Sequence, residues 1–295
     1  MLSIIITAFK EPKSIGKAIE SIINQNIQEK YELIISAPDK ETLKIAEEYS
    51  KKNKNIRVFK DPGKGKVFAI NKILPRLKGE IILLTDGDVF ISENSVQDLI
   101  KPFENKGVGA VTGRVMSINP RNNMLGYWSH LLCEAAHRMR LNRFKKNQFL
   151  ECSGYLWAFR NNFLKEIPRD TAEDTIVPLL FYLKGYKISY IPYAEVYVKF
   201  PQTFRDFINQ KIRTAKAHET LSRYVSIKDF PRMKSIKNEI FESHYLFLFP
   251  KNIREIFWTL LLFPVRLYIW FAVFFKRYIK KEYKVDNWKR IDSTK

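Results

Sequence analysis

Strand patterns alternate with helix patterns three times in the first 80 residues. Buried-strand patterns cover residues 2–8, 31–37 and 56–59, and each is followed by a helix pattern with apolar residues on one face, at 15–23, 40–52 and 67–77. Such alternation is typical of parallel strands, because each helix returns the chain across the sheet. The sequence therefore predicts an α/β fold with a mostly parallel sheet and flanking helices.

A further buried strand leads directly into two carboxylates. Residues 81–85 are all apolar or β-branched, and Asp86-Gly87-Asp88 follows them. The carboxyl ends of the strands form the ligand-binding edge of an open α/β sheet, and two carboxylates there repel each other unless a cation lies near them. Mg²⁺ and Mn²⁺ are commonly held by one or two carboxylates together with water and phosphate oxygens. We therefore expect a divalent metal site; the alternative is an ordinary Asp-Gly-Asp turn.

Two other segments carry candidate chemistry. Asp61-Pro62-Gly63-Lys64-Gly65-Lys66 precedes a helix pattern, so its glycines and lysines could cradle a phosphate, although the P-loop spacing is missing and a solvated basic turn is the alternative. Thr171-Ala172-Glu173-Asp174 precedes the apolar run 176–183. A threonine three residues before an acid is typical of a capping box, yet a carboxylate at a helix start can also project into a cleft.

The charge balance indicates an anionic partner. The chain has 51 Lys and Arg against 31 Asp and Glu, a formal net charge of +20. Phosphorylated substrates, acidic lipid headgroups and nucleic acid all fit this charge. We expect no nucleic-acid partner, because the sequence shows no zinc-finger spacing and no RNA-recognition signature. Its two cysteines form no disulfide framework, which fits a reducing compartment.

The last 65 residues are predicted to attach the protein to a membrane. Residues 256–275 are apolar nearly all round, and as a helix they would be about 30 Å long, the thickness of a bilayer core. Pro264 and Arg266 argue against a simple span and favour a hairpin or a helix in the interface. Basic residues follow at 276, 277, 280 and 281, as expected for the cytoplasmic face of the cell membrane. The alternative is a buried C-terminal helix of a soluble protein.

The order of these motifs resembles that of the family 2 inverting glycosyltransferases, which have the GT-A (Rossmann-like) fold. The resemblance covers roughly residues 1–220, and residues 231–295 follow a predicted catalytic domain of residues 1–230. The matching segments are Thr7-Ala8-Phe9-Lys10-Glu11, Gly63-Lys64-Gly65 with Asn71, Asp86-Gly87-Asp88, Ser153-Gly154, Thr171-Ala172-Glu173-Asp174, and Gln210-Lys211-Ile212-Arg213, the last of which partly matches the polysaccharide synthase members.

The resemblance implies a metal pair, a base and a donor-binding set. Asp86 and Asp88 would bind Mn²⁺ or Mg²⁺, and Asp174, with Glu173 as second candidate, would take the proton from the acceptor hydroxyl. The implied donor-binding residues are Ala8, Phe9, Glu11, Asp39, Lys64, Asp86, Gln210 and Arg213.

Two departures from the family pattern affect the expected specificity. Ser36-Ala37-Pro38-Asp39 stands where the family usually has the Asp-Asp-Gly-Ser that holds uracil, so Asp39 is only a candidate and the base stays open. Thr214 stands where polysaccharide synthases have a tryptophan, which weakens the case for a long polymer.

The predicted function is transfer of a sugar from a nucleotide-diphosphate sugar to a hydroxyl of a lipid-linked or glycan acceptor at the membrane surface. A UDP-sugar is the favoured donor. The alternatives are a sugar nucleotidyltransferase and a nonenzymatic basic protein that binds membranes or nucleic acid. The nucleotidyltransferase is disfavoured because the first strand is not followed by a glycine-rich loop with arginine.

Overall fold

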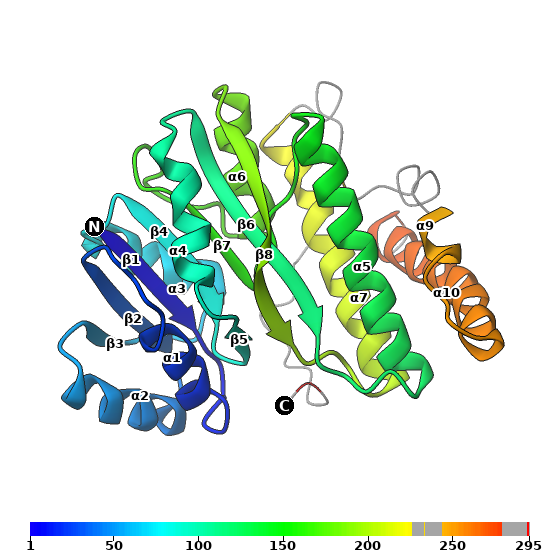
Figure 1. Cartoon of the computed structure of the whole chain (residues 1–295), viewed down its shortest axis with the longest axis horizontal. Helices are drawn as coiled ribbons and strands as arrows, with labels where there is room; N and C mark the ends of the chain where they lie inside the picture. The colour runs from blue at the N-terminus through cyan, green and yellow to red at the C-terminus, as the bar shows by residue number, and fades with distance from the viewer. Residues whose placement is uncertain (226–232, 234–243, 279–293, 295) are drawn as a thin grey trace.

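Eight strands form one sheet in the computed structural model, which describes residues 1–225, 233, 244–278 and 294 (Figure 1). The sheet order is β3-β2-β1-β4-β7-β6-β8-β5. The strands are β1 (Leu2–Thr7), β2 (Tyr31–Ala37), β3 (Ile56–Lys60), β4 (Ile81–Asp86), β5 (Val89–Ile91), β6 (Val108–Ser117), β7 (Leu156–Arg160) and β8 (Lys187–Val198).

Helices cover both faces of this sheet and extend beyond its edge. The α-helices are α1 (Ile15–Ile23), α2 (Lys40–Lys52), α3 (Lys66–Ile73), α4 (Ser95–Ile100), α5 (Met124–Lys145), α6 (Glu173–Leu183), α7 (Phe204–Glu219), α9 (His244–Phe247) and α10 (Ile253–Tyr278). Short 3₁₀ helices are η1 (Leu74–Arg76), η2 (Lys101–Glu104) and η3 (Thr220–Arg223).

The amino-terminal half of the sheet is parallel, as the strand and helix alternation predicts. β1 lies between β2 and β4 and runs parallel to both, and β3 adds to β2 in the same direction. In this register Thr7 is paired with Ser36 on one side and with Asp86 on the other. The carboxyl ends of three strands therefore meet at one edge, where the sequence places its first candidate carboxylates.

The other half of the sheet is mixed. β7 runs antiparallel to β4 and to β6, β6 runs parallel to β8, and β5 pairs antiparallel with β8. Because β7 is antiparallel to β4, its first residue, Leu156, is paired with Thr85 near the end of β4. The segment just before β7 consequently lies beside Asp86.

The core is divided between the two faces of the sheet. Ile4 and Ile6 pack with residues of α1, α2 and α4, whereas Ile5 packs with residues of α3 and α6. This division follows from the two-residue period of a strand, which turns successive side chains to opposite faces. Buried strands with apolar residues on both faces are typical of such a three-layer arrangement.

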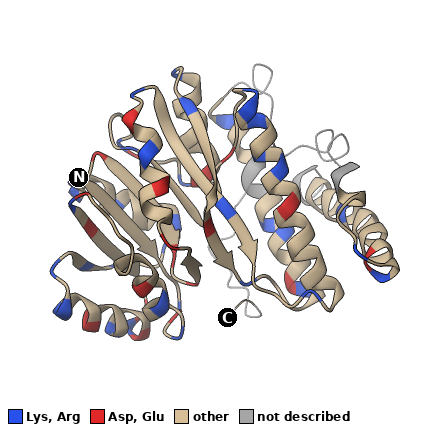
Figure 2. Cartoon of the chain, viewed as in Figure 1, with Lys and Arg blue, Asp and Glu red and all other residues tan. Residues whose placement is uncertain are grey.

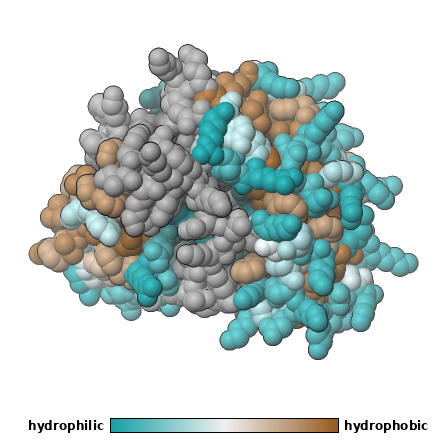
Figure 3. Space-filling view, turned by 180° about the vertical axis from the view of Figure 1, so that it is seen from behind, coloured by the Kyte–Doolittle hydropathy of each residue, from teal (hydrophilic) through white to brown (hydrophobic). Residues whose placement is uncertain are grey.

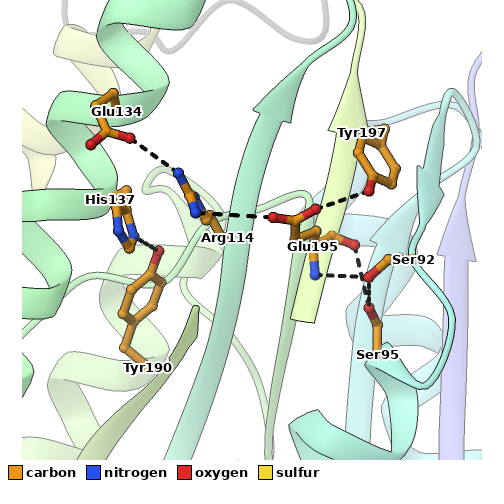
Figure 4. Close-up of polar contacts among 8 residues, drawn as sticks. All are labelled: Ser92, Ser95, Arg114, Glu134, His137, Tyr190, Glu195 and Tyr197. Carbon is orange, nitrogen blue, oxygen red and sulfur yellow. Dashed lines mark hydrogen bonds and ion pairs between the residues drawn. The ribbon is translucent and has the colours of Figure 1, made fainter. Parts of the chain in front are cut away.

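A polar cluster holds α5 against the strands β6 and β8 (Figure 4). Arg114 of β6 lies 3.1 Å from a carboxylate oxygen of Glu134 on α5 and 4.0 Å from one of Glu195 on β8. One turn along α5, His137 Nδ1 lies 2.7 Å from the hydroxyl of Tyr190. These contacts link the helix to two neighbouring strands and fix its position beside the sheet.

A third apolar cluster joins α5, α7 and α10 beyond the sheet. Tyr127, Phe207 and Leu262 are buried members from the three helices in turn. α10 continues through Pro264 as one helix, so the hairpin, one of the two arrangements expected from the sequence, does not form. The predicted boundary between residues 230 and 231 lies outside the described residues and stays a prediction.

Candidate active site

A lysine at the start of α3 joins two carboxylates from different elements. Lys66 Nζ lies 2.7 Å from Asp86 Oδ1, at the end of β4, and 2.9 Å from Glu173 Oε1, at the start of α6. It also donates a hydrogen bond of 3.2 Å to the carbonyl oxygen of Gly154, just before β7. All three charged side chains are largely buried. Three segments of the chain thus meet at one ammonium group from a fourth.

The surroundings of this cluster change the pKa of two of its members. Burial alone would lower the pKa of Lys66, but the charges of Asp86 and Glu173 outweigh it and raise that pKa, so the lysine stays cationic. Burial raises the pKa of Glu173, the nearby Asp174 raises it further, and Lys66 opposes both. Lys66 therefore offsets the charge repulsion among the carboxylates.

Asp174 is held by a backbone amide close to this cluster. Its Oδ2 accepts a hydrogen bond of 2.8 Å from the N–H of Gly154. A Cβ atom at Gly154 would lie 3.2 Å from that same oxygen and 3.8 Å from Lys66 Nζ, so glycine allows the backbone to come this close. α6 begins at Glu173, and no described side chain caps it, so the capping-box interpretation of Thr171 is wrong.

The metal candidates Asp86 and Asp88 and an arginine of α7, Arg213, all act electrostatically on one residue, Tyr155. Burial raises the pKa of the Tyr155 hydroxyl, Asp88 and Asp86 raise it further, and Arg213 opposes them, so all three charges act on one hydroxyl. Thr7 Oγ1 donates a hydrogen bond of 3.0 Å to Asp86 Oδ1. The sheet edge and α7 thus contribute to one site.

The donor set at this edge fits a hard divalent cation. Within the described part of the chain, no group of three or more His, Cys, Asp or Glu side chains is arranged to hold a metal. Asp86 uses Oδ1 for both Lys66 and Thr7, so Oδ2 is the oxygen that it could offer to a metal. Mg²⁺ and Mn²⁺ need only one or two carboxylates when water and phosphate oxygens supply the rest, so two carboxylates such as Asp86 and Asp88 would be enough.

The predicted donor residues after β1 pack against the Asp86-Gly87-Asp88 turn. A Cβ atom at Gly87 would lie 2.5 Å from Glu11 Oε2 and 2.7 Å from Ala8 Cβ, so both residues support the turn from behind. Phe9 is half-buried, and Lys10 Nζ lies 5.6 Å from its ring centre. Ala8 and Glu11 are thus brought to the site.

Asp39 binds backbone groups of the loop after β1 and of the first turn of α2. Its Oδ2 accepts a hydrogen bond of 2.7 Å from the N–H of Lys10, and its Oδ1 accepts one of 3.0 Å from the N–H of Thr42, which caps α2. Burial by itself would raise the pKa of Asp39, but the hydrogen bonds from Thr42 and Lys10 lower it. The residue therefore connects the first loop to α2.

Lys64 and Lys66 occupy different surroundings. Lys64 is exposed, and its Nζ lies 5.6 Å from the ring centre of Phe68, whose ring Arg169 also covers at 4.9 Å. Sequence reasoning placed both lysines in a candidate phosphate cradle but named only Lys64 among the donor-binding residues. The signal that favours Lys66 is its position directly before the apolar helix pattern of residues 67–77.

Gln210 and Arg213 lie three residues apart on α7, so their side chains share one side of the helix. Both residues are half-buried. The charge of Arg213 reaches Tyr155, whereas the carbonyl oxygen of Gln210 accepts a hydrogen bond of 3.0 Å from Thr214 Oγ1. Arg213 thus affects the same tyrosine as Asp86 and Asp88, and Gln210 lies on the same side of α7.

Asn71 of α3 holds the segment that leads to the two acids. Its Nδ2 donates to the carbonyl oxygen of Ile167 at 2.7 Å, and its Oδ1 accepts from the N–H of Ile167 at 2.8 Å. Because the same helix carries Lys66, α3 contacts both Glu173 and the loop before it. Sequence reasoning included Asn71 in a motif without giving it a role.

Two relatives of known name are similar over most of this chain. A probable glycosyltransferase, YdaM, of Bacillus subtilis is 25% identical over 83% of this chain and 61% of its own length. The poly-beta-1,6-N-acetyl-D-glucosamine synthase of Staphylococcus aureus is 22% identical over 75% of this chain and 56% of its own. The chain thus spans about three fifths of the length of these relatives.

A solved structure shares the fold. The mannosyltransferase PcManGT of Pyrobaculum calidifontis, in complex with GDP-Man and Mn²⁺, is similar over 95% of this chain and 81% of its own, with a TM-score of 0.61 and 16% identity. This likeness confirms the predicted GT-A-like fold. The family model of Glycosyl transferase family 2 matches residues 3–168, more than half of the chain, and agrees with the predicted enzyme class. The chain therefore belongs to glycosyl transferase family 2.

Proposed function

We propose that this protein transfers a sugar from a nucleotide-diphosphate sugar to a hydroxyl of a lipid-linked or glycan acceptor, with inversion at the anomeric carbon. The observation that carries the proposal is the double contact of Lys66. Through it, the Asp86 carboxylate at the sheet edge and the acidic pair of α6 belong to one cluster. Transfer needs charge stabilisation on the donor side and a base on the acceptor side, and this cluster offers both.

On the donor side, Asp86 and Asp88 would hold Mn²⁺ or Mg²⁺ against the diphosphate. A metal held there would supply a Lewis acid that offsets the negative charge growing on the leaving nucleotide diphosphate. Lys66 and Arg213 bring further positive charge to this edge, and charge-assisted hydrogen bonds to phosphate are among the stronger ones. These residues bind and orient the donor.

On the acceptor side, Asp174 is the base and takes the proton from the attacking hydroxyl. The Gly154 amide holds one of its oxygens at 2.8 Å and so fixes the carboxylate. Glu173 already pairs with Lys66 at 2.9 Å, which makes it the weaker candidate. A single displacement by the activated hydroxyl gives inversion.

The proposed classes of donor and acceptor are inferred from the family resemblance and from the names of similar proteins. UDP is the expected nucleotide from the family resemblance, whereas the similar mannosyltransferase structure contains GDP-Man and Mn²⁺. The Staphylococcus relative is named for a polysaccharide, which supports a glycan acceptor. The apolar α10 and the net charge of +20 support attachment to the cytoplasmic face of the cell membrane.

A thermal-shift panel tests the donor half of this proposal. UDP, GDP and other nucleoside diphosphates are added with and without Mn²⁺, and the expected result is a rise in melting temperature for one of them that depends on the metal. A ligand that binds only the folded state stabilises it by about 2.7 kcal/mol at a hundredfold excess over its Kd. The same rise in an Asp88→Asn variant would contradict the assigned metal site.

A further inference from the structure

The outward side of α10 carries a continuous apolar stripe. Every exposed residue from Ile256 to Phe275 is aliphatic, aromatic or proline. Six large members are between 52% and 66% exposed: Phe257, Leu260, Leu267, Tyr268, Phe271 and Phe274. Their spacing follows the period of one helix face. A helix that rests on a soluble protein shows the opposite pattern, with polar residues outward.

The inward side of the same helix carries its bonded polar groups. Arg121, in the loop before α5, donates from Nε to Glu255 Oε1 at 2.9 Å and from a terminal nitrogen to Oε2 at 2.7 Å. The hydroxyls of Tyr127 and Thr259 lie 2.6 Å apart. These directional contacts fix the rotation of α10 about its axis, and so they fix which residues face outward.

α10 lies against the body of the protein along its length. Buried side chains on its inward side extend from Glu255 to Val273, and they pack with residues of α5 and α7. Arg266, the charge that opposes insertion of this segment, is half-buried and lies off the exposed stripe. A transmembrane span would require α10 to leave this entire contact, whereas a helix lying flat keeps it.

The charge of the protein favours a lipid bilayer, and disfavours a second copy of the protein, as the partner that covers the apolar stripe. Figure 2 shows α10 largely free of charged residues, and Figure 3 shows apolar atoms gathered on the side where α9 and α10 lie. Lys251 and Arg254 are exposed at the amino-terminal end of the stripe. A net charge of +20 repels a second copy and attracts anionic lipid headgroups.

We propose that α10 lies in the plane of an anionic bilayer surface, with its exposed stripe inserted to the boundary of headgroups and acyl chains and without spanning the bilayer. Interfacial helices bury an apolar face to a depth of about 5–10 Å. The inference rests on the proposed membrane attachment and gives its geometry. Because α7 packs on α10 and also carries Arg213, the membrane contact and the candidate site share one helix.

Vesicle flotation of the full chain tests the surface. The probes are phosphatidylcholine vesicles with and without phosphatidylglycerol, and the test variant is Phe257→Asp with Phe271→Asp. Each phenylalanine that the bilayer buries should contribute about tenfold to the partition coefficient between vesicles and water. Loss of both should therefore lower that coefficient about a hundredfold. The control is Leu183→Asp with Tyr193→Asp, two residues that are 50% and 60% exposed on other elements and should leave binding unchanged.

Flotation of the Phe257 and Phe271 variant at the level of the wild type would overturn the proposal, and so would absence of wild-type binding to anionic vesicles. Dimerisation of the wild type without vesicles, lost in the same variant, would assign the stripe to a second copy. The melting temperature and its nucleotide-dependent rise are measured on every variant. An intact rise with lost flotation separates failure of the membrane contact from failure of the transferase proposal.

Fluorescence quenching at Leu267→Cys tests the flat geometry. Position 267 lies in the middle of the stripe, so a flat helix holds a label near the headgroups, and a span holds it at the bilayer centre. Labelling is selective because burial raises the pKa of the Cys133 thiol to about 12 and that of Cys152 as well. Stronger quenching by lipids with a nitroxide at a shallow position is expected, and stronger quenching by a deep nitroxide would overturn the proposal.

Discussion

Lys66 is the cation that two carboxylates of the candidate site share. Its ammonium group lies within 2.9 Å of Glu173 and 2.7 Å of Asp86, and all three side chains are largely withdrawn from water. Removing one partner from a buried ion cluster leaves uncompensated charge, which costs more than the cluster contributes as a whole. Lys64, only two residues away, is exposed and offers a matched comparison.

Replacement of Lys66 by methionine should lower the free energy of unfolding by roughly 3 kcal/mol in metal-free buffer, because Asp86 and Glu173 then repel each other without a cation between them. Denaturant unfolding at neutral pH measures this change. Lys64→Met is the control and should stay within about 0.5 kcal/mol of the wild type. If the two substitutions changed the free energy of unfolding equally, Lys66 would not stabilise the protein through the buried cluster.

At the scale of elements, the docking of α10 depends on one buried acid. Glu255 accepts two hydrogen bonds from Arg121 and a third, of 2.7 Å, from the N–H of Lys251. The hydrogen bonds from Arg121 hold the pKa of Glu255 below its usual value of 4.5, and burial opposes them. A carboxylate whose pKa is lower in the folded state than in the unfolded state stabilises the fold. This stabilisation is complete above the pKa of the unfolded state and is lost as the pH falls through the pKa of the folded state.

Replacement of Glu255 by glutamine should therefore cost about 2 kcal/mol at neutral pH, and the gap from wild type should close as the pH falls below about 4.5. Denaturant unfolding at a series of pH values, followed by tryptophan fluorescence, measures the gap. Glu166→Gln removes an exposed ion pair with Arg169 and should have little effect at any pH. A gap for Glu255→Gln that does not change with pH would contradict this account of the docking.

At the scale of the whole molecule, the parallel half of the fold could be predicted because each strand and helix is a local pattern. Asp86 and Asp88 could be selected for a similar reason, since they come at the end of a buried strand, whereas the choice of Asp174 comes from the family resemblance. Contacts between distant segments could not. Asn71 meets a residue 96 positions away, and Arg121 meets one 134 positions away.

The choice between Lys64 and Lys66 shows that a local pattern also fails to predict tertiary contacts for two residues that are close in sequence. Both lysines follow a glycine, and the residue at which α3 begins decides which side chain reaches the carboxylates. Likewise the composition of residues 256–275 indicates an apolar helix, but only its packing on α5 and α7 determines which side faces outward. Tertiary contacts, which a local pattern does not contain, settle both questions.

The measurement that tests the central claim most directly is sugar transfer by Asp174→Asn, from the donor that gives the largest thermal shift into a membrane extract. Asparagine can still accept the hydrogen bond from the Gly154 amide, so the site should keep its geometry while losing the base. We predict a fall in transfer of about a hundredfold or more with donor binding unchanged. Transfer at the wild-type rate would contradict the claim, and a comparable loss in Glu173→Gln alone would assign the base to Glu173.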